Sequence, residues 1–179
     1  MSDSQSGLNK RDAKLVVLKL VALVLLAVVL SGLPWVNETI IAPIDRFTAL
    51  VFTGIARLLG CDLQNFDVSV VGTLFGTSIN VRIGYGCDGV LAFLILVCGV
   101  LPLPVSWRWK GIGVGLGLLY VFAINQVRIA ALVLALLTNP SHERFEFYHI
   151  YAGQLFAIVM VFMFWSNWLN RALGPAQDD

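Results

Sequence analysis

The sequence predicts an all-α, polytopic membrane protein with about four transmembrane helices, organised as a single membrane domain over residues 1–179. Of its 179 residues, 58% are hydrophobic and only 13% are charged, which is far from the composition of soluble domains. A spanning helix needs ~20 mostly apolar residues. Four segments meet that need, at about 15–33, 87–103, 111–138 and 149–169.

The first span, residues 15–33, follows a polar stretch and could be mistaken for a signal peptide. Its apolar run is longer than the hydrophobic region of a signal peptide, and no clear small-x-small cleavage site follows it. We therefore expect a retained helix, with Lys19 extending its ammonium group toward the interface.

The basic residues that flank the spans predict the orientation. With an even number of spans, all of these flanks lie on one side, and short basic flanks mark the cytoplasmic side. We therefore expect a protein of the inner (cytoplasmic) membrane with both termini in the cytoplasm. Residues 34–86 and 139–148 would lie outside. The basic residues in question are Lys10, Arg11, Lys14, Arg108, Lys110 and Arg171.

The outer segment 34–86 is too long for a simple loop. Within residues 36–59, apolar side chains recur every three or four positions, which is one face of a helix. Asn37 is a suitable N-cap, so we expect an amphipathic helix that lies on the outer interface. The apolar positions are Ile40, Ile44, Phe47, Val51, Ile55 and Leu58.

After this helix, the stretches "FDVSVVG" and "TSINVRIGYG" alternate between apolar and polar residues on either side of Leu74, Phe75 and Gly76. Such alternation indicates a short β-hairpin, whose exposed strands could bind an extended peptide by strand addition. A loop packed over the helices is the alternative.

Composition also excludes several classes of function. The net charge of +1 provides no broad basic field for nucleic acid. The three cysteines, Cys61, Cys87 and Cys98, form no C-x-x-C pair and have no histidine at metal-ligand spacing. We therefore expect no metal, no cofactor and no disulfide scaffold.

The third span carries Asn125, Gln126 and Arg128 among apolar residues. A buried arginine costs at least ~2.5–3.5 kcal/mol on insertion scales, so it needs a partner or a function. Arg128 lies ~25 Å beyond Gly111 at 1.5 Å per residue, in the outer half of the bilayer. Asn125 shares its helix face and could hold the guanidinium. The alternative is a structural arginine paired with a carboxylate such as Asp88.

Cys87 begins the second span on the outer side. A helix N-terminus lowers a thiol pKa and favours the nucleophilic thiolate, although Asp88 acts in the opposite direction. Cys98 is best interpreted as a small apolar residue. A disulfide between Cys61 and Cys87 is the alternative that would remove the nucleophile. Room for a substrate backbone is expected at the glycines Gly84, Gly86 and Gly89.

His149 opens the fourth span at its outer end, and Gly153, one turn later, allows a close helix approach. The topology therefore brings Cys87, Arg128 and His149 from three helices to one outer face. A thiolate can attack a carbonyl, a histidine can move protons, and a guanidinium can stabilise an oxyanion.

At these residues the chain resembles the exosortase and archaeosortase family of prokaryotic membrane cysteine transpeptidases. The resemblance rests on Cys87-Asp88-Gly89, on Asn125-x-x-Arg128 and on His149-x-x-x-Gly153, over roughly residues 80–160. The short chain with four spans is more similar to the compact exosortase H subtype than to longer members.

The resemblance implies that the protein cleaves C-terminal sorting signals, each made of a short motif, a membrane helix and a basic tail, from exported proteins. Cys87 would form a thioester, His149 would be general acid and base, and Arg128 would stabilise the intermediate before transfer to an acceptor. Asn125, Asp88 and Gly153 would support them. Membrane lipid is an expected partner and nucleic acid is not. Asp88 departs from the serine or alanine that follows the family's cysteine, which makes the pKa of the thiol uncertain.

Two other functions stay open. In a non-enzymatic membrane assembly or binding protein, Arg128 would pair structurally and Cys87 would be incidental. In a carrier, Arg128 would be an anion site, but four spans without an evident inverted repeat or broken helix pair give that function little support.

Overall fold

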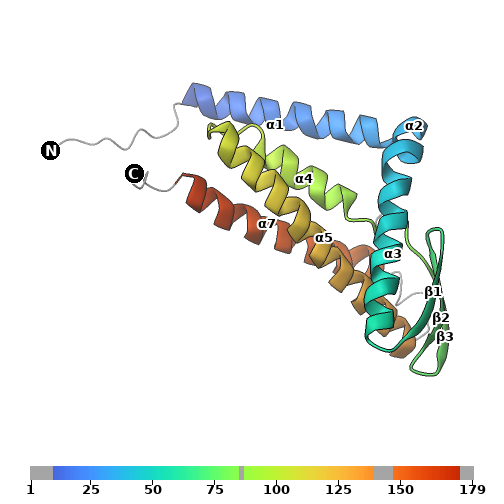
Figure 1. Ribbon diagram of the computed structural model, residues 1–179. Coiled ribbons are helices and arrows are strands. Elements are labelled where there is room, and N and C mark those ends of the chain that lie inside the picture. The colour runs from blue at the N-terminus through green and yellow to red at the C-terminus, as the bar shows by residue number, and fades with distance from the viewer. Residues whose placement is uncertain (1–9, 85–86, 139–146, 174–179) are drawn as a thin grey trace.

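The computed structural model describes residues 10–84, 87–138 and 147–173. Four helices lie side by side: α1 (Lys10–Ser31), α4 (Val90–Val100), α5 (Trp107–Thr138) and α7 (Gly153–Ala172) (Figure 1). A fifth helix stands across one end of this bundle, and a small sheet packs on it. The protein is therefore a mostly helical membrane bundle with an α/β cap at one end.

Hydropathy and length identify four helical stretches that could cross a membrane: Lys14–Ser31, Pro34–Leu58, Trp107–Thr138 and Phe147–Ala172. Three of them agree with the predicted spans. The predicted span at 87–103 is wrong in extent, because α4 covers only the 11 residues Val90–Val100. Gly89 has a left-handed backbone (φ 77°) that delays the start of the helix, and the prolines at positions 102 and 104 prevent its continuation.

The amphipathic helix is present as one continuous stretch, made of α2 (Pro34–Val36), the π-helical turn η1 (Asn37–Ile41) and α3 (Ala42–Leu58). It stands across the bundle end, as Figure 1 shows. Asn37 is not its N-cap, because Pro34 begins the helix. The Asn37 amide donates instead to the carbonyls of Ser31 (3.1 Å) and Leu33 (3.3 Å), where α1 ends.

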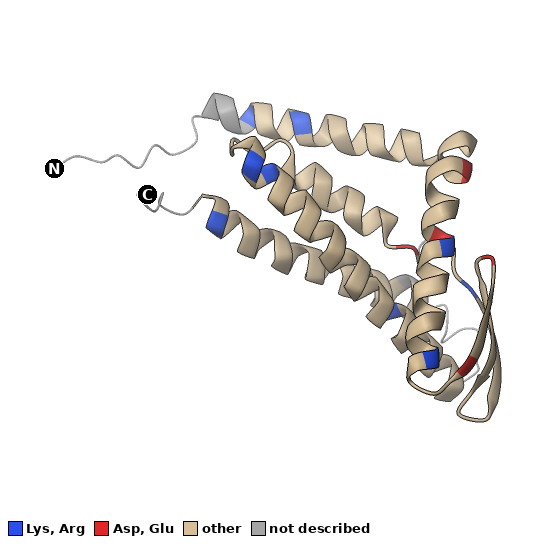
Figure 2. Ribbon diagram, viewed as in Figure 1, with Lys and Arg blue, Asp and Glu red and all other residues tan. Residues whose placement is uncertain are grey.

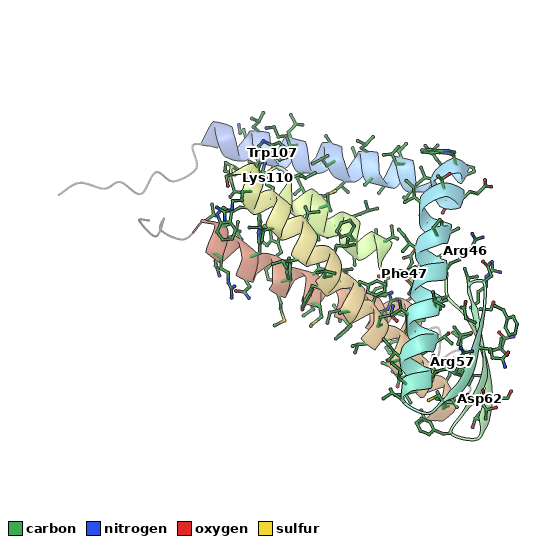
Figure 3. The ribbon with its side chains drawn as sticks, viewed as in Figure 1. Arg46, Phe47, Arg57, Asp62, Trp107 and Lys110 are labelled. Atoms are coloured by element: carbon green, nitrogen blue, oxygen red, sulfur yellow. The ribbon has the colours of Figure 1, made fainter. Side chains whose placement is uncertain are left out.

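The two faces of α3 have different surroundings. Much of the predicted apolar stripe is exposed, including Phe47 at 55% and Leu58 at 89%, and the labelled Phe47 points away from the sheet side (Figure 3). The opposite face is buried and combines small, aromatic and polar residues, namely Asp45, Thr48, Ala49, Phe52, Thr53 and Ala56. The exposed apolar stripe suits contact with lipid at the interface.

The predicted hairpin is confirmed as β2 (Ser69–Leu74) and β3 (Thr77–Arg82), joined by a two-residue turn. Phe75 and Gly76 both have positive φ, at 50° and 79°, as this kind of tight hairpin turn requires. A further strand, β1 (Asp62–Phe66), pairs antiparallel with β2 and gives the order β1-β2-β3. The sheet thereby has an apolar face wide enough to pack on α3.

Two apolar cores divide the molecule. The outer core joins α3, the sheet and the second half of α5 through residues that include Phe52, Leu63, Val70, Ile129 and Val133. The inner core joins α4, α5 and α7 through Leu96, Val100, Val121, Val161 and Trp168. The candidate site lies where these two cores meet.

The two ends of the bundle differ in their charged residues. Figure 2 shows lysines and arginines at the end where α1 and α5 begin and α7 ends, and both arginines and acidic residues at the end formed by α3 and the sheet. Lys110, labelled in Figure 3 beside Trp107, donates to the Leu101 carbonyl (2.7 Å) at this end. The flanks predicted to be basic thus share one end, while the sheet and α3 occupy the other.

Candidate functional site

Cys87 lies in the connection between β3 and α4, and its backbone is held at both ends. Its N–H donates to the Gly84 carbonyl (2.8 Å), and its carbonyl accepts a hydrogen bond from the Asn125 amide (2.7 Å). The buried Asn125 therefore fixes the cysteine backbone, whereas the sequence predicted that it would hold the guanidinium of Arg128. Asn125 therefore positions Cys87, a role that its spacing from Arg128 in the sequence did not indicate.

Asp88 and Gly89 shape the turn that follows. The Asp88 carboxylate accepts a hydrogen bond from the Val90 N–H (3.0 Å), so it caps the first turn of α4. Gly89 has positive φ, and a Cβ there would lie 3.3 Å from the Asn125 side chain. The backbone conformation and the closeness of Asn125 thus both favour glycine at position 89. Gly86, also predicted to make room, lies outside the described residues.

His149 faces the thiol from the π-helical turn η2 (Phe147–Ala152), which precedes α7. Its Nδ1 lies 3.2 Å from Cys87 Sγ, and its Nε2 lies 3.7 Å away. Such distances suit proton transfer between thiol and imidazole. The three cysteines are free thiols in the structure, so the disulfide considered between Cys61 and Cys87 is not formed.

Arg128 is only 5% exposed, although it belongs to a membrane helix. Its Nη2 donates to the backbone carbonyl of His149 (3.1 Å). A Cβ at Gly153 would lie 2.6 Å from Arg128 Nε, so the glycine leaves the space that the guanidinium occupies. The structure therefore brings together Cys87, Arg128 and His149, with Gly153 beside them.

The pKa of the Cys87 thiol is shifted in the direction opposite to the one predicted from the sequence. Cys87 precedes α4, and burial raises the pKa of its thiol; the positive charge of Arg128 opposes that shift. Negative charge at Asp88 and Asp45 adds to it. Burial also raises the pKa of Asp88, against the Val90 N–H and Arg128. The predicted lowering by a helix N-terminus does not prevail, because α4 begins three residues later.

A raised pKa favours the thiol over the thiolate, so a nearby base has to take its proton during attack. His149 is the base within reach. This arrangement differs from a preformed thiolate, which needs strong positive charge and good solvation around the sulfur.

A polar cavity of about 480 Å³ opens beside the pair and is lined by Cys87 and His149. Its charged lining includes Asp45, Arg46 and Arg82. The sequence did not predict Asp45 as a site residue. Asp45 stands on the helix face opposite the apolar stripe and is 9% exposed, which follows from the packing of α3 and not from a sequence motif.

The described residues around the thiol do not form a set of metal ligands. Among the described residues, no group of three or more histidine, cysteine, aspartate or glutamate side chains could hold a metal ion.

Comparisons with known proteins give one match. No curated protein matches the chain, and no solved structure does. The family model described as transmembrane exosortase (Exosortase_EpsH) matches residues 9–165. That range covers most of the chain and includes Cys87, Arg128 and His149. The predicted family is thereby confirmed, and the chain belongs to the transmembrane exosortases.

Proposed function

We propose that this protein is a membrane-embedded cysteine transpeptidase or protease, which cleaves C-terminal sorting signals of exported proteins through a thioester on Cys87. The observation that carries the proposal is the 3.2 Å separation of Cys87 Sγ and His149 Nδ1. Membership of the exosortase family supports the same chemistry. The adjoining polar cavity provides space for a peptide main chain.

In the first half-reaction, His149 takes the thiol proton as Cys87 Sγ attacks the carbonyl carbon of the scissile peptide bond. A C–S bond forms, and the carbonyl oxygen becomes an oxyanion. Collapse of this intermediate breaks the C–N bond, and the leaving amine takes the proton from the imidazolium. The thioester then holds the exported protein, while the membrane helix and basic tail leave.

In the second half-reaction, an acceptor nucleophile attacks the thioester carbonyl and gives its proton to His149. The C–S bond breaks, and the sulfur regains a proton from the imidazolium. Transfer and hydrolysis differ only in whether the nucleophile is an acceptor group or water.

Arg128 has two roles in this proposal. Its hydrogen bond to the His149 carbonyl holds the π-helical turn against the thiol. Its positive charge would stabilise the oxyanion, and removal of such a group typically costs ~10²–10³ in rate.

The site would lie on the outer side of the cytoplasmic membrane, with both chain termini in the cytoplasm. The basic residues at the opposite bundle end support this orientation, because short basic flanks mark the cytoplasmic side (Figure 2).

The test is processing of a tagged sorting-signal protein in cells that carry Cys87→Ala, Arg128→Ala or His149→Ala. We expect cleavage to be lost in the first and third and to fall at least ~100-fold in the second. Cys98→Ala is the matched control, because Cys98 is a free, buried thiol within α4 and is not among the described lining of the polar cavity. Unchanged cleavage in any of the three variants would contradict the triad. Unchanged cleavage in all three variants would favour a non-enzymatic membrane protein with a structural Arg128.

A further inference from the structure

Two cavities, and not one, meet at the Cys87 and His149 pair. The larger is the polar cavity described above, of about 480 Å³. The smaller has about 110 Å³ and shares four lining residues with the larger one, Arg82, Ile83, Cys87 and His149. The rest of its described lining is aliphatic and comes from β3 and α5: Val81, Ile129, Leu132, Val133 and Leu136.

The chemistry of the proposed thioester limits where substrate groups can lie. The residue that supplies the acyl group is bonded to Sγ through its carbonyl carbon, so its side chain begins only two bonds further on. That side chain has to enter a space that Cys87 itself lines. The polar main chain on either side needs hydrogen-bonding partners, since unpaired amide groups are costly to bury. Such partners line the larger cavity, whereas the smaller one is suited to a hydrocarbon group.

The volume of the small cavity sets the size of that group. An apolar cavity of ~150 Å³ binds benzene, so a cavity of about 110 Å³ has room for a hydrocarbon group smaller than an aromatic ring. The side chains of leucine and isoleucine have four carbons. An aromatic ring with its methylene exceeds the space, and most of the wall is aliphatic, with Arg82 as its one charged residue among those described.

We propose that the aliphatic cavity beside Cys87 is a specificity subsite that receives an aliphatic side chain of up to four carbons from the substrate residue whose carbonyl is attacked. This inference rests on the proposed function, because it assigns a part of the substrate to the same site. Leu136 sets the size of the subsite at its rim, since it is half-buried, whereas Leu132 and Val133 are buried in α5.

The subsite can be tested without knowledge of the natural substrate. The probes are N-acetyl aminoacyl chloromethyl ketones of alanine, leucine, phenylalanine and aspartate, with iodoacetamide as a probe that lacks a side chain. Sγ displaces chloride from the methylene carbon, so a C–S bond forms as the C–Cl bond breaks. The full chain in detergent is treated with each probe, and labelling of Cys87 is followed by peptide mass spectrometry.

We expect the leucine probe to label Cys87 at least about tenfold faster than the alanine probe, because each buried methylene adds ~0.8 kcal/mol. The phenylalanine and aspartate probes should be no faster than the alanine probe. In Leu136→Ala, the leucine preference should shrink and the phenylalanine probe should gain about tenfold. Leu134→Ala is the matched control, because it removes a leucine from the same helix that is 48% exposed and lies outside this cavity.

Equal rates for all four aminoacyl probes, or no change of preference in Leu136→Ala, would overturn the subsite. Failure of iodoacetamide to label Cys87 would overturn both the subsite and the nucleophile. Loss of the proposed function alone has a different signature, in which side-chain selectivity persists while Cys87→Ala still processes the tagged sorting-signal protein.

Discussion

The two halves of α5 show how the same helix serves packing at one end and polar contacts at the other. In the first half, Gly113 and Gly117 admit the side chains of Trp168 and Leu96, with hypothetical Cβ contacts of 2.6 Å in both cases. In the second half, Asn125 and Arg128 are buried and donate to backbone carbonyls of the site. In the first half, the glycines allow neighbouring helices to pack closely. In the second half, polar side chains position a cysteine and a histidine.

Substitutions in the first half of α5 should affect stability, and substitutions in the second half should affect activity. A steric clash or a lost hydrogen bond in the inner core changes only the packing of the helices. The same change near Cys87 moves groups that the proposed reaction uses. Matched pairs of variants in the two halves can therefore separate the two effects.

The largest difference in processing is expected between two glycine substitutions. Gly153→Ala places a methyl group 2.6 Å from Arg128 Nε, so the guanidinium has to move and processing should fall at least ~100-fold. Gly113→Ala places a methyl group equally close to Trp168, and it should lower the free energy of unfolding by ~1–3 kcal/mol. Processing per folded molecule and thermal unfolding in detergent measure the two effects. Equal losses of activity per folded molecule would contradict the division.

The next largest difference in processing is expected between substitutions of two adjacent buried amides, Asn125 and Gln126. Asn125→Ala leaves the Cys87 carbonyl without its donor, and at ~1–3 kcal/mol for such a loss, processing should fall about tenfold or more. The side-chain atoms of Gln126 have no hydrogen-bond partner among the described residues. Gln126→Leu should therefore leave processing unchanged and keep or raise the thermal stability. A strong loss of processing in Gln126→Leu would show that this amide serves the site.

A smaller effect is expected for a tryptophan of the inner core. The indole N–H of Trp168 donates to the Trp109 carbonyl (3.1 Å). Trp168→Phe keeps an aromatic side chain and removes this bond, so unfolding should become easier by ~1 kcal/mol. Cys87 labelling by iodoacetamide should proceed at the normal rate. A slower labelling would mean that the inner core and the site are coupled.

The smallest effect is a shift in pH dependence. Burial raises the pKa of the Cys87 thiol, and the negative charge of Asp88 adds to that shift. Asp88→Asn removes the charge and keeps an oxygen that can accept from the Val90 N–H. The thiol pKa should fall, so iodoacetamide labelling of Cys87 should begin at lower pH. Asp62→Asn on β1 is the control and should leave the profile in place. A shift to higher pH in Asp88→Asn would contradict the assigned charge effect.

Hydropathy was sufficient for the long helices, and the motifs around Cys87, Arg128 and His149 were sufficient for the family. Apolar runs predicted α1, α5 and α7, and alternation predicted β2 and β3. Both patterns are set by which residues face lipid, core or water. The trio of Cys87, Arg128 and His149 followed from topology, because residues at one end of adjacent spans share one face of the membrane.

The features that sequence reasoning missed depend on single backbone angles and on contacts between distant residues. The left-handed backbone of Gly89 shortens α4. β1 has one buried side chain, Leu63, and so gives little alternation. Asn125 contacts Cys87 across 38 positions in the sequence, and the burial of Asp45 depends on the placement of α3 against the sheet. No local pattern contains these contacts.

In the proposed reaction, Cys87 carries the acyl group of the exported protein. The most direct measurement is detection of a covalent adduct between this protein and a tagged sorting-signal protein that is co-expressed with it. The account predicts an adduct that maps to Cys87, is released by neutral hydroxylamine as a thioester should be, and is lost in Cys87→Ala together with processing. Processing that continues in Cys87→Ala, or an adduct that maps to Cys61 or Cys98, would contradict it.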